Sequence, residues 1–218
     1  MVEISNSDKK ILTKDVSRIV WEYRIAPDNT NIRPICNDKI DYSEIQVIRV
    51  QLKQRIHLTS ITNLIMSSFQ YPLLLVFEES NESMFVAAQV RINQTDRSKI
   101  VVEDVVKTDW ITEEQIGDDL NISKMKTTNI FDLYTDIFNS VMKLRVKCRT
   151  KIIEDLSPDE YKLIDRMISQ IDEKISKLKL MLKNEDQFNT QMELNDEILA
   201  LQKYEDVCIK NITTNHAR

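Results

Sequence analysis

Glycine and histidine are scarce, since the 218-residue sequence has one glycine and two histidines. The single glycine, Gly117, excludes a glycine-rich phosphate loop, a dinucleotide-binding fingerprint and the Gly-x-Ser-x-Gly elbow of hydrolases. With only His57 and His216 present, we expect neither a multi-histidine metal site nor a Ser-His-Asp triad. We interpret His57 as a polar residue at a helix start, and we expect no cofactor and no bound metal.

Cysteines and long apolar runs are also sparse. Cys36, Cys148 and Cys208 are odd in number and far apart, which indicates reduced thiols rather than a disulfide framework. The N-terminus lacks the apolar core of a signal peptide, and the longest apolar stretch, around residues 72–77, is too short to span a bilayer. We therefore expect a cytoplasmic protein that does not bind membranes.

The charge balance is moderately acidic. A net charge of −5, with 42% hydrophobic and 30% charged residues, is typical of a folded, soluble, charge-rich chain. This total gives no overall attraction to nucleic acid or to anionic membranes, although a local basic patch is compatible with it.

The most regular pattern lies in residues 156–218. Ser157, Pro158 and Glu160 have the order of a capping box with proline at the first helical position, so a helix begins there. Apolar residues then recur at spacings of three and four, which is typical of a helix that packs lengthwise on another helix: Tyr161, Ile164, Ile168, Ile171, Ile175, Leu178 and Leu182.

The pattern loses phase after Leu182 and resumes at Phe188. A helical hairpin that turns near residues 184–189 and a continuous helix with a stutter both fit this break. We favour the hairpin, because it lets the chain bury its own apolar seam.

The earlier sequence predicts a small sheet. Residues 44–53 alternate between the two faces of a strand, and residues 72–78 form a short apolar run typical of a central strand. Residues 84–91 and 99–106 have the patterns of two further strands. Residues 26–41 are rich in turn formers and predict an ordered loop.

Helical spacing predicts an amphipathic helix at residues 8–25, capped by Asp8 or Thr13 and with Trp21 packed in the core. A shorter helix at residues 58–69 is expected to cover the sheet.

A second capping box at residues 112–115 predicts a brief helical turn before a polar linker at residues 117–128. The next helix, from Ile130 to Leu144, has a wide apolar face that must be buried on the sheet or against the tail. The predicted fold class is α+β, with a small mixed sheet of about four strands packed with helices and a C-terminal α-helical coiled-coil hairpin. The predicted parts are an α+β domain at 1–126, a buried connecting helix at 127–155 and the hairpin tail at 156–218.

Three blocks of the sequence resemble an uncharacterised prokaryotic family, domain of unknown function 4391. They are Ile19 to Pro27 followed by Asn31-Ile32, the strand Glu44 to Gln54 followed by Tyr71 to Phe77, and Phe188-Asn189 with Met192 to Asn195. The resemblance covers nearly the whole chain in order. It implies a small cytoplasmic protein of bacteria and archaea, encoded beside helicases and DNA methyltransferases in restriction-like, anti-phage loci.

The sharpest enzymatic hypothesis is a metal-dependent nuclease of the Asp…Glu-x-Lys type, in which carboxylates hold Mg²⁺ and a lysine steadies the developing charge. Gln51 and Lys53 stand at a strand end, where Glu-x-Lys would be, and Asp41 is the candidate aspartate. However, the amide of Gln51 is a poor Mg²⁺ ligand, and Asp41 follows a predicted loop rather than a strand. We therefore expect a non-catalytic protein, with a nuclease of degenerate motif as the alternative.

Basic residues at the strand ends suggest a milder hypothesis. Arg49, Lys53 and Arg91 would gather at one side of the sheet and contact phosphate or an acidic partner. The alternative is that these charges keep the sheet edges soluble, which we favour.

The break in the tail predicts a docking site. Phe188, Met192, Leu194 and Asn195 would form a tip or seam for a larger protein, such as a helicase or DNA methyltransferase subunit. Self-packing of the hairpin explains the same residues equally well. We therefore expect an accessory or adaptor subunit of an anti-phage defence complex, and a homodimer held by the tail is a further alternative.

Overall fold

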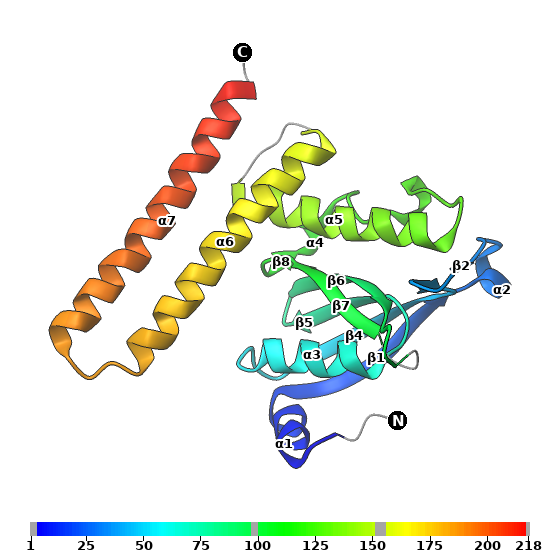
Figure 1. The fold of residues 1–218 in the computed structure, drawn as a ribbon, viewed down its shortest axis with the longest axis horizontal. Coiled ribbons are helices and arrows are strands. Elements are labelled where there is room, and N and C mark those ends of the chain that lie inside the picture. The colour runs from blue at the N-terminus through cyan, green and yellow to red at the C-terminus, as the bar shows by residue number, and fades with distance from the viewer. Residues whose placement is uncertain (1–3, 97–99, 151–155, 217–218) are drawn as a thin grey trace. The chain divides into compact units, whose positions relative to one another are not determined.

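The computed structural model describes residues 4–96, 100–150 and 156–216 and has a mixed α+β fold (Figure 1). It divides into two compact units, residues 1–145 and 146–218. The predicted fold class is therefore confirmed, while the domain boundaries predicted at residues 126 and 156 stay predictions. Lys99, the predicted start of a strand, and residues 151–155 of the predicted connecting helix lie outside the described residues.

A six-stranded mixed sheet forms the centre of the first unit. Its strands are β1 (Val16–Ile25), β4 (Ile45–Leu52), β5 (Leu73–Glu79), β6 (Glu82–Ile92), β7 (Ile100–Lys107) and β8 (Ile111–Thr112). The order is β1-β4-β5-β6-β7, with β8 also paired to β6. Only β4 and β5 are parallel among these pairs, as a helical crossover between them requires. A separate two-stranded sheet joins β2 (Ile35–Cys36) to β3 (Asp41–Tyr42).

The helices of the first unit are α1 (Asn6–Asp15), α2 (Pro27–Thr30), α3 (Leu58–Ser68), α4 (Glu113–Ile116), a short 3-10 helix η1 (Ile122–Lys124) and most of α5 (Ile130–Thr150). The second unit contains α6 (Pro158–Lys183) and α7 (Phe188–His216). Within the described residues, no helix combines the length and the apolar character needed to cross a bilayer.

One face of the sheet packs against α3. The alternation predicted for residues 44–53 places Ile48 and Val50 in a core that also contains Phe77 of β5 and Ile61 and Ile65 of α3. The predicted helix at 58–69 and the predicted central position of residues 72–78 are therefore confirmed.

The opposite face of the sheet carries α5 (Figure 1). Tyr134, which is 1% exposed, accepts a hydrogen bond from the Ala88 N–H at 3.1 Å. Its hydroxyl lies 2.8 Å from the carbonyl oxygens of Leu73 and Ala88, so it donates to the backbone of β5 or β6. Burial raises the pKa of Tyr134, so the hydroxyl keeps its proton for this bond. The wide apolar face predicted for this helix is buried, and Tyr134 attaches it to the sheet.

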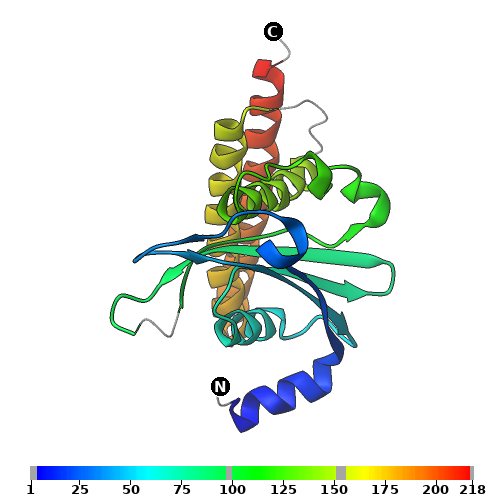
Figure 2. The ribbon, with the colours of Figure 1, turned by 90° about the vertical axis from the view of Figure 1, so that its right-hand side faces the viewer.

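The prediction of a single helix at residues 8–25 is wrong. Helix α1 begins at the N-cap Ser5, rather than at Asp8 or Thr13, and ends at Asp15, after which the chain continues as β1 (Figure 2). Residues 16–25 contain β-branched and aromatic side chains that suit a strand, and pairing with β4 satisfies their backbone. Trp21 is 61% exposed and does not pack in the core. Missing β1 and the two-residue β8 explains why only about four strands were predicted.

The C-terminal tail is a helical hairpin, as predicted. Ser157 and Glu160 form the expected capping box, and Pro158 is the first residue of α6. The helices α6 and α7 pack through a common apolar seam formed by Ile171, Ile175, Leu178, Leu194 and Ile198. Four residues, 184–187, connect them, so the loss of phase after Leu182 marks a turn and not a stutter.

Replacing Tyr134 by Phe tests how α5 is attached to the sheet. The register between β5 and β6 ends at the pair Leu74 and Ala87, and the Tyr134 hydroxyl bonds the backbone of the next two residues, Leu73 and Ala88. Its removal leaves buried backbone groups unpaired, and we expect a loss of about 1–3 kcal/mol in the free energy of unfolding, measured by urea denaturation. The exposed Tyr23→Phe is the matched control, and equal stability of both variants would contradict this role of Tyr134.

Candidate functional site

A polar cluster lies where α1 ends and β4 leads into α3. Lys53, which follows β4, donates from its backbone N–H to the Asp15 carbonyl at 2.7 Å. Its ammonium group donates to the Thr13 carbonyl at 2.9 Å. A cation at this position satisfies a free carbonyl and opposes the negative end of the helix dipole of α1. Lys53, the lysine that would stabilise the developing charge in a nuclease site, is therefore hydrogen-bonded to backbone carbonyls of α1.

The carboxylate of Asp15 is the centre of this cluster. Asp15 is 0% exposed, and it accepts hydrogen bonds from the His57 backbone N–H at 3.2 Å, from His57 Nδ1 at 2.5 Å and from the amide of Gln54. Burial raises the pKa of Asp15, but the hydrogen bonds from Gln54 and His57 outweigh it, so this pKa lies below its ordinary value. The carboxylate is therefore a charged acceptor, and it holds His57 by Nδ1.

A carboxylate that orients a histidine is also the arrangement found in hydrolase triads and behind metal-bound histidines. His57 stands at the N-cap of α3, as the sequence predicts. In the described part of the chain, no group of three or more His, Cys, Asp and Glu side chains is placed to hold a metal ion. The Asp15–His57 pair links two segments that are 42 residues apart in the chain.

The structure separates the candidate nuclease residues. Asp41 lies in β3, where its carboxylate accepts hydrogen bonds from Cys36 Sγ and the Ser43 N–H, both at 3.1 Å. The adjacent Tyr42 contacts the backbone of Val90, near the end of the sheet at which β4 begins. Gln51 is near the other end of β4, beside Glu78 in the register. Because the strand rises roughly 3.3 Å per residue, these ends are about 20 Å apart, so Asp41 does not share a site with Gln51 and Lys53.

The three candidate cations are not brought together either. Arg49 lies within β4, with its guanidinium 3.1 Å from Glu22 and 2.8 Å from Glu78. Arg91 pairs with Glu103 at 2.5 Å near the end of β6, which runs antiparallel to β5. Arg91 and Lys53 therefore lie near opposite ends of the strands. Two of the three charges are neutralised by neighbouring carboxylates.

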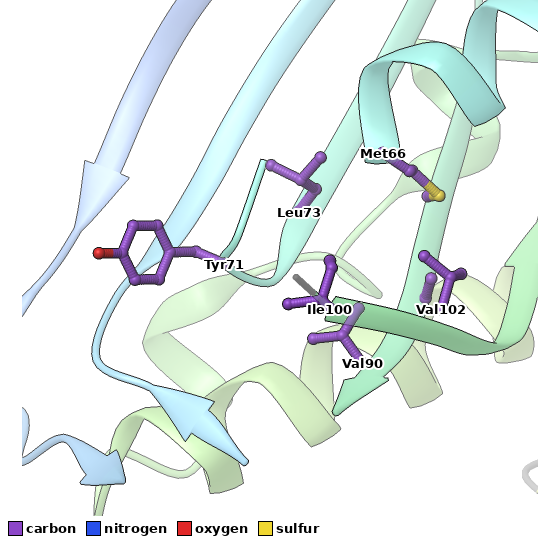
Figure 3. Close-up of a pocket in the computed structure, with 7 residues that line it drawn as sticks. Met66, Tyr71, Leu73, Val90, Ile100 and Val102 are labelled. Atoms are coloured by element: carbon purple, nitrogen blue, oxygen red, sulfur yellow. The ribbon is translucent and has the colours of Figure 1, made fainter. Parts of the chain in front are cut away.

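One apolar pocket in the described part of the first unit is too small for a ligand. Figure 3 shows apolar side chains from α3, β5, β6 and β7 around it, including Met66, Leu73 and Val102. The cavity has a volume of about 10 Å³, close to the minimum that one water molecule needs.

The predicted docking residues divide into two groups. Leu194 belongs to the seam between α6 and α7, as the self-packing alternative requires. Phe188 and Met192 are 71% and 52% exposed, and Asn195 is also exposed. Only part of the predicted set is therefore free to meet a partner.

The structure adds residues that the sequence reasoning missed. Leu199 on α7 is 52% exposed and lies seven residues after Met192, so both are on one side of the helix. Leu180 and Met181, at the end of α6, are 63% and 57% exposed. We name the exposed apolar residues around residues 184–187 the hairpin tip: Leu180, Met181, Phe188 and Met192. The seven-residue interval from Met192 to Leu199 was a signal for this surface, whereas nothing in the sequence linked Asp15 to His57.

A model of one protein family, described as a domain of unknown function (DUF4391), matches residues 1–204. The chain belongs to this family. The DUF4391 match runs through both units and into α7 as far as Tyr204, so the hairpin tip lies inside the family domain. No curated protein and no solved structure matches the chain.

The pH dependence of stability tests the buried Asp15. Since the pKa of Asp15 in the folded chain is below its ordinary value of 3.8, its contribution to stability is full above that pH and is lost as the pH falls through the folded pKa. We expect Asp15→Asn to lower the urea midpoint most at neutral pH, with the difference from wild type shrinking below about pH 4. Asp104→Asn, at an exposed position, controls for the change in net charge. A difference that is constant from pH 7 to 3 would contradict the charged state of Asp15.

The alkylation rate of the Cys36 thiol tests whether the Asp41 carboxylate raises the pKa of that thiol. Desolvation of the thiol and the adjacent Asp41 carboxylate raise the pKa of Cys36 to about 11, so little thiolate exists at neutral pH. In Asp41→Asn the repelling charge is gone, and we expect alkylation of Cys36 by iodoacetamide to become several-fold faster at pH 8. Peptide mass spectrometry separates this thiol from Cys148 and Cys208. An unchanged rate would mean that Asp41 does not act on the thiol.

Proposed function

We propose that this DUF4391 protein is a non-catalytic accessory subunit that binds a larger protein through its hairpin tip. The observation that carries the proposal is the exposure of Phe188, at 71%, beside a buried seam that the same helices already share. Because the hairpin packs without this side chain, its apolar surface is available to a partner. An exposed aromatic residue with methionine neighbours is typical of an adaptable protein interface.

Charge around the tip indicates the chemistry of the partner. Residues 184–202 contain five acidic residues and no lysine or arginine. Glu193 and Asp196 on the first turns of α7 are exposed beside Met192. We therefore expect the partner to present an apolar groove rimmed by basic side chains, which the acidic flanks would orient.

The family resemblance supports a helicase or DNA methyltransferase subunit of an anti-phage system as that partner. The nuclease alternative loses support from the separation of Asp41 from Gln51 and Lys53. Association of two copies through the same tip is the remaining alternative, and the experiment below distinguishes it.

The experiment compares the tagged full-length chain with the double variant Phe188→Ser, Met192→Ser. A helicase or methyltransferase that co-purifies from the native cell is expressed, purified and titrated with each chain by calorimetry. We expect the variant to bind at least about tenfold more weakly, because two apolar anchors are lost. Leu163→Ser is the matched control, since Leu163 is 64% exposed near the start of α6, away from the tip.

Equal binding by the double variant would exclude the tip as the interface. If neither a helicase nor a methyltransferase binds the purified chain, and the wild type alone forms a dimer that the double variant loses, the tip joins two copies and the accessory role is wrong.

A further inference from the structure

Strand β1 forms one edge of the six-stranded sheet, and no described segment pairs with its outer side. It is ten residues long and carries Ile19 and Trp21 with exposed fractions of 46% and 61%. An edge strand presents unpaired N–H and C=O groups, which another strand can satisfy. This surface is separate from the hairpin tip and independent of the function proposed for it.

The register with β4 assigns the β1 side chains to two faces. Between two irregularities, after Val16 and after Trp21, β1 pairs regularly with β4. Trp21 lies opposite Ile48 and Ile19 opposite Val50, so both share the face on which α3 packs.

The other face of β1 carries its charges. Val20 lies opposite Arg49, and Arg18 lies two residues before Val20 on the same face. The Glu22 carboxylate meets Arg49 at 3.1 Å, which places it on this face as well. Arg18 is exposed, and no ion pair of Arg18 is formed within the described part of the chain.

We propose that β1 pairs antiparallel with β1 of a second copy of this chain, with the two-fold axis at Val20. In that register, Arg18 lies opposite Glu22 of the second copy, and Ile19 lies opposite its Trp21. Each of these pairs occurs twice, and the members of each pair are on the same face of the joined sheet. The second oxygen of the Glu22 carboxylate accepts from the incoming arginine, while the first remains with Arg49.

Charge selects this register over its neighbours. Moving the axis to Trp21 would place Arg18 opposite Arg24, and like charges directly opposite each other destabilise a pair of strands. Moving it to Ile19 would place Arg18 opposite Val20 and leave both charges without partners. The order Arg18, Ile19, Val20, Trp21, Glu22 is self-complementary only about Val20. This charge complementarity identifies the occupant of the edge as a second copy.

The test is the solution mass of the full-length chain as a function of concentration, by sedimentation equilibrium. We expect a monomer–dimer equilibrium. Arg18→Glu alone and Glu22→Arg alone each place two like-charged pairs in the dimer, and each should raise its dissociation constant about tenfold. The double variant restores opposite charges and should return the constant to near the wild-type value. Thermal unfolding of each variant verifies that it is folded.

A second substitution tests the apolar pair. Trp21→Lys should abolish the dimer, whereas Val105→Lys should leave it unchanged, because Val105 is 48% exposed on the other edge strand, β7. A monomer at every concentration would overturn the proposal. So would a dimer that persists in Trp21→Lys, or one that only the hairpin-tip variant Phe188→Ser, Met192→Ser dissolves.

Discussion

The buried carboxylate of Asp15 is the contact on which the arrangement of the first unit depends. It lies at the last residue of α1, and its three hydrogen-bond donors come from Gln54 and His57, between β4 and α3. An ionised group without exposure is tolerated in a folded chain only when donors surround it. Its position therefore fixes where α1 stops and where β1 starts to pair with β4.

That dependence explains which parts of the fold could be predicted from the sequence. The strands β4, β5 and β6 and the helices α3, α5 and α6 carry their patterns within a few neighbouring residues, and each was predicted near its observed bounds. The tail was also predictable, because Ser157, Pro158 and Glu160 form a local capping box. Strand β1 was not, because Val16, Ile19, Val20 and Tyr23 also fit helical spacing. The choice between helix and strand depends on β4 and on His57, which lie far along the chain.

The candidate site was predicted less well for a related reason. A sequence shows which side chains carry charge, but not which charges neutralise one another. From the sequence, Arg49 was interpreted as a free cation at a strand end. In the structure it forms ion pairs with Glu22 and Glu78 from the two neighbouring strands. His57 looked isolated, yet it is held by Asp15. By contrast, the exposure of Phe188 and Met192 could be predicted, because the loss of phase after Leu182 marks a turn, and residues beside a turn have fewer neighbours to cover them.

The two proposed contacts, one at the hairpin tip and one at the β1 edge, together predict how strongly the protein would bind its partner. A dimer through β1 carries two hairpin tips, whatever the placement of the hairpins relative to the sheets. When the first tip binds a partner that offers two sites, the effective concentration of the second tip at the second site rises. Two weak contacts then give a much higher overall affinity than either contact alone. Because charged pairs at a strand edge contribute little each, the dimer itself would be weak and the gain would depend on protein concentration. The strength of partner binding would then rise with the concentration of this chain, which would couple the two surfaces.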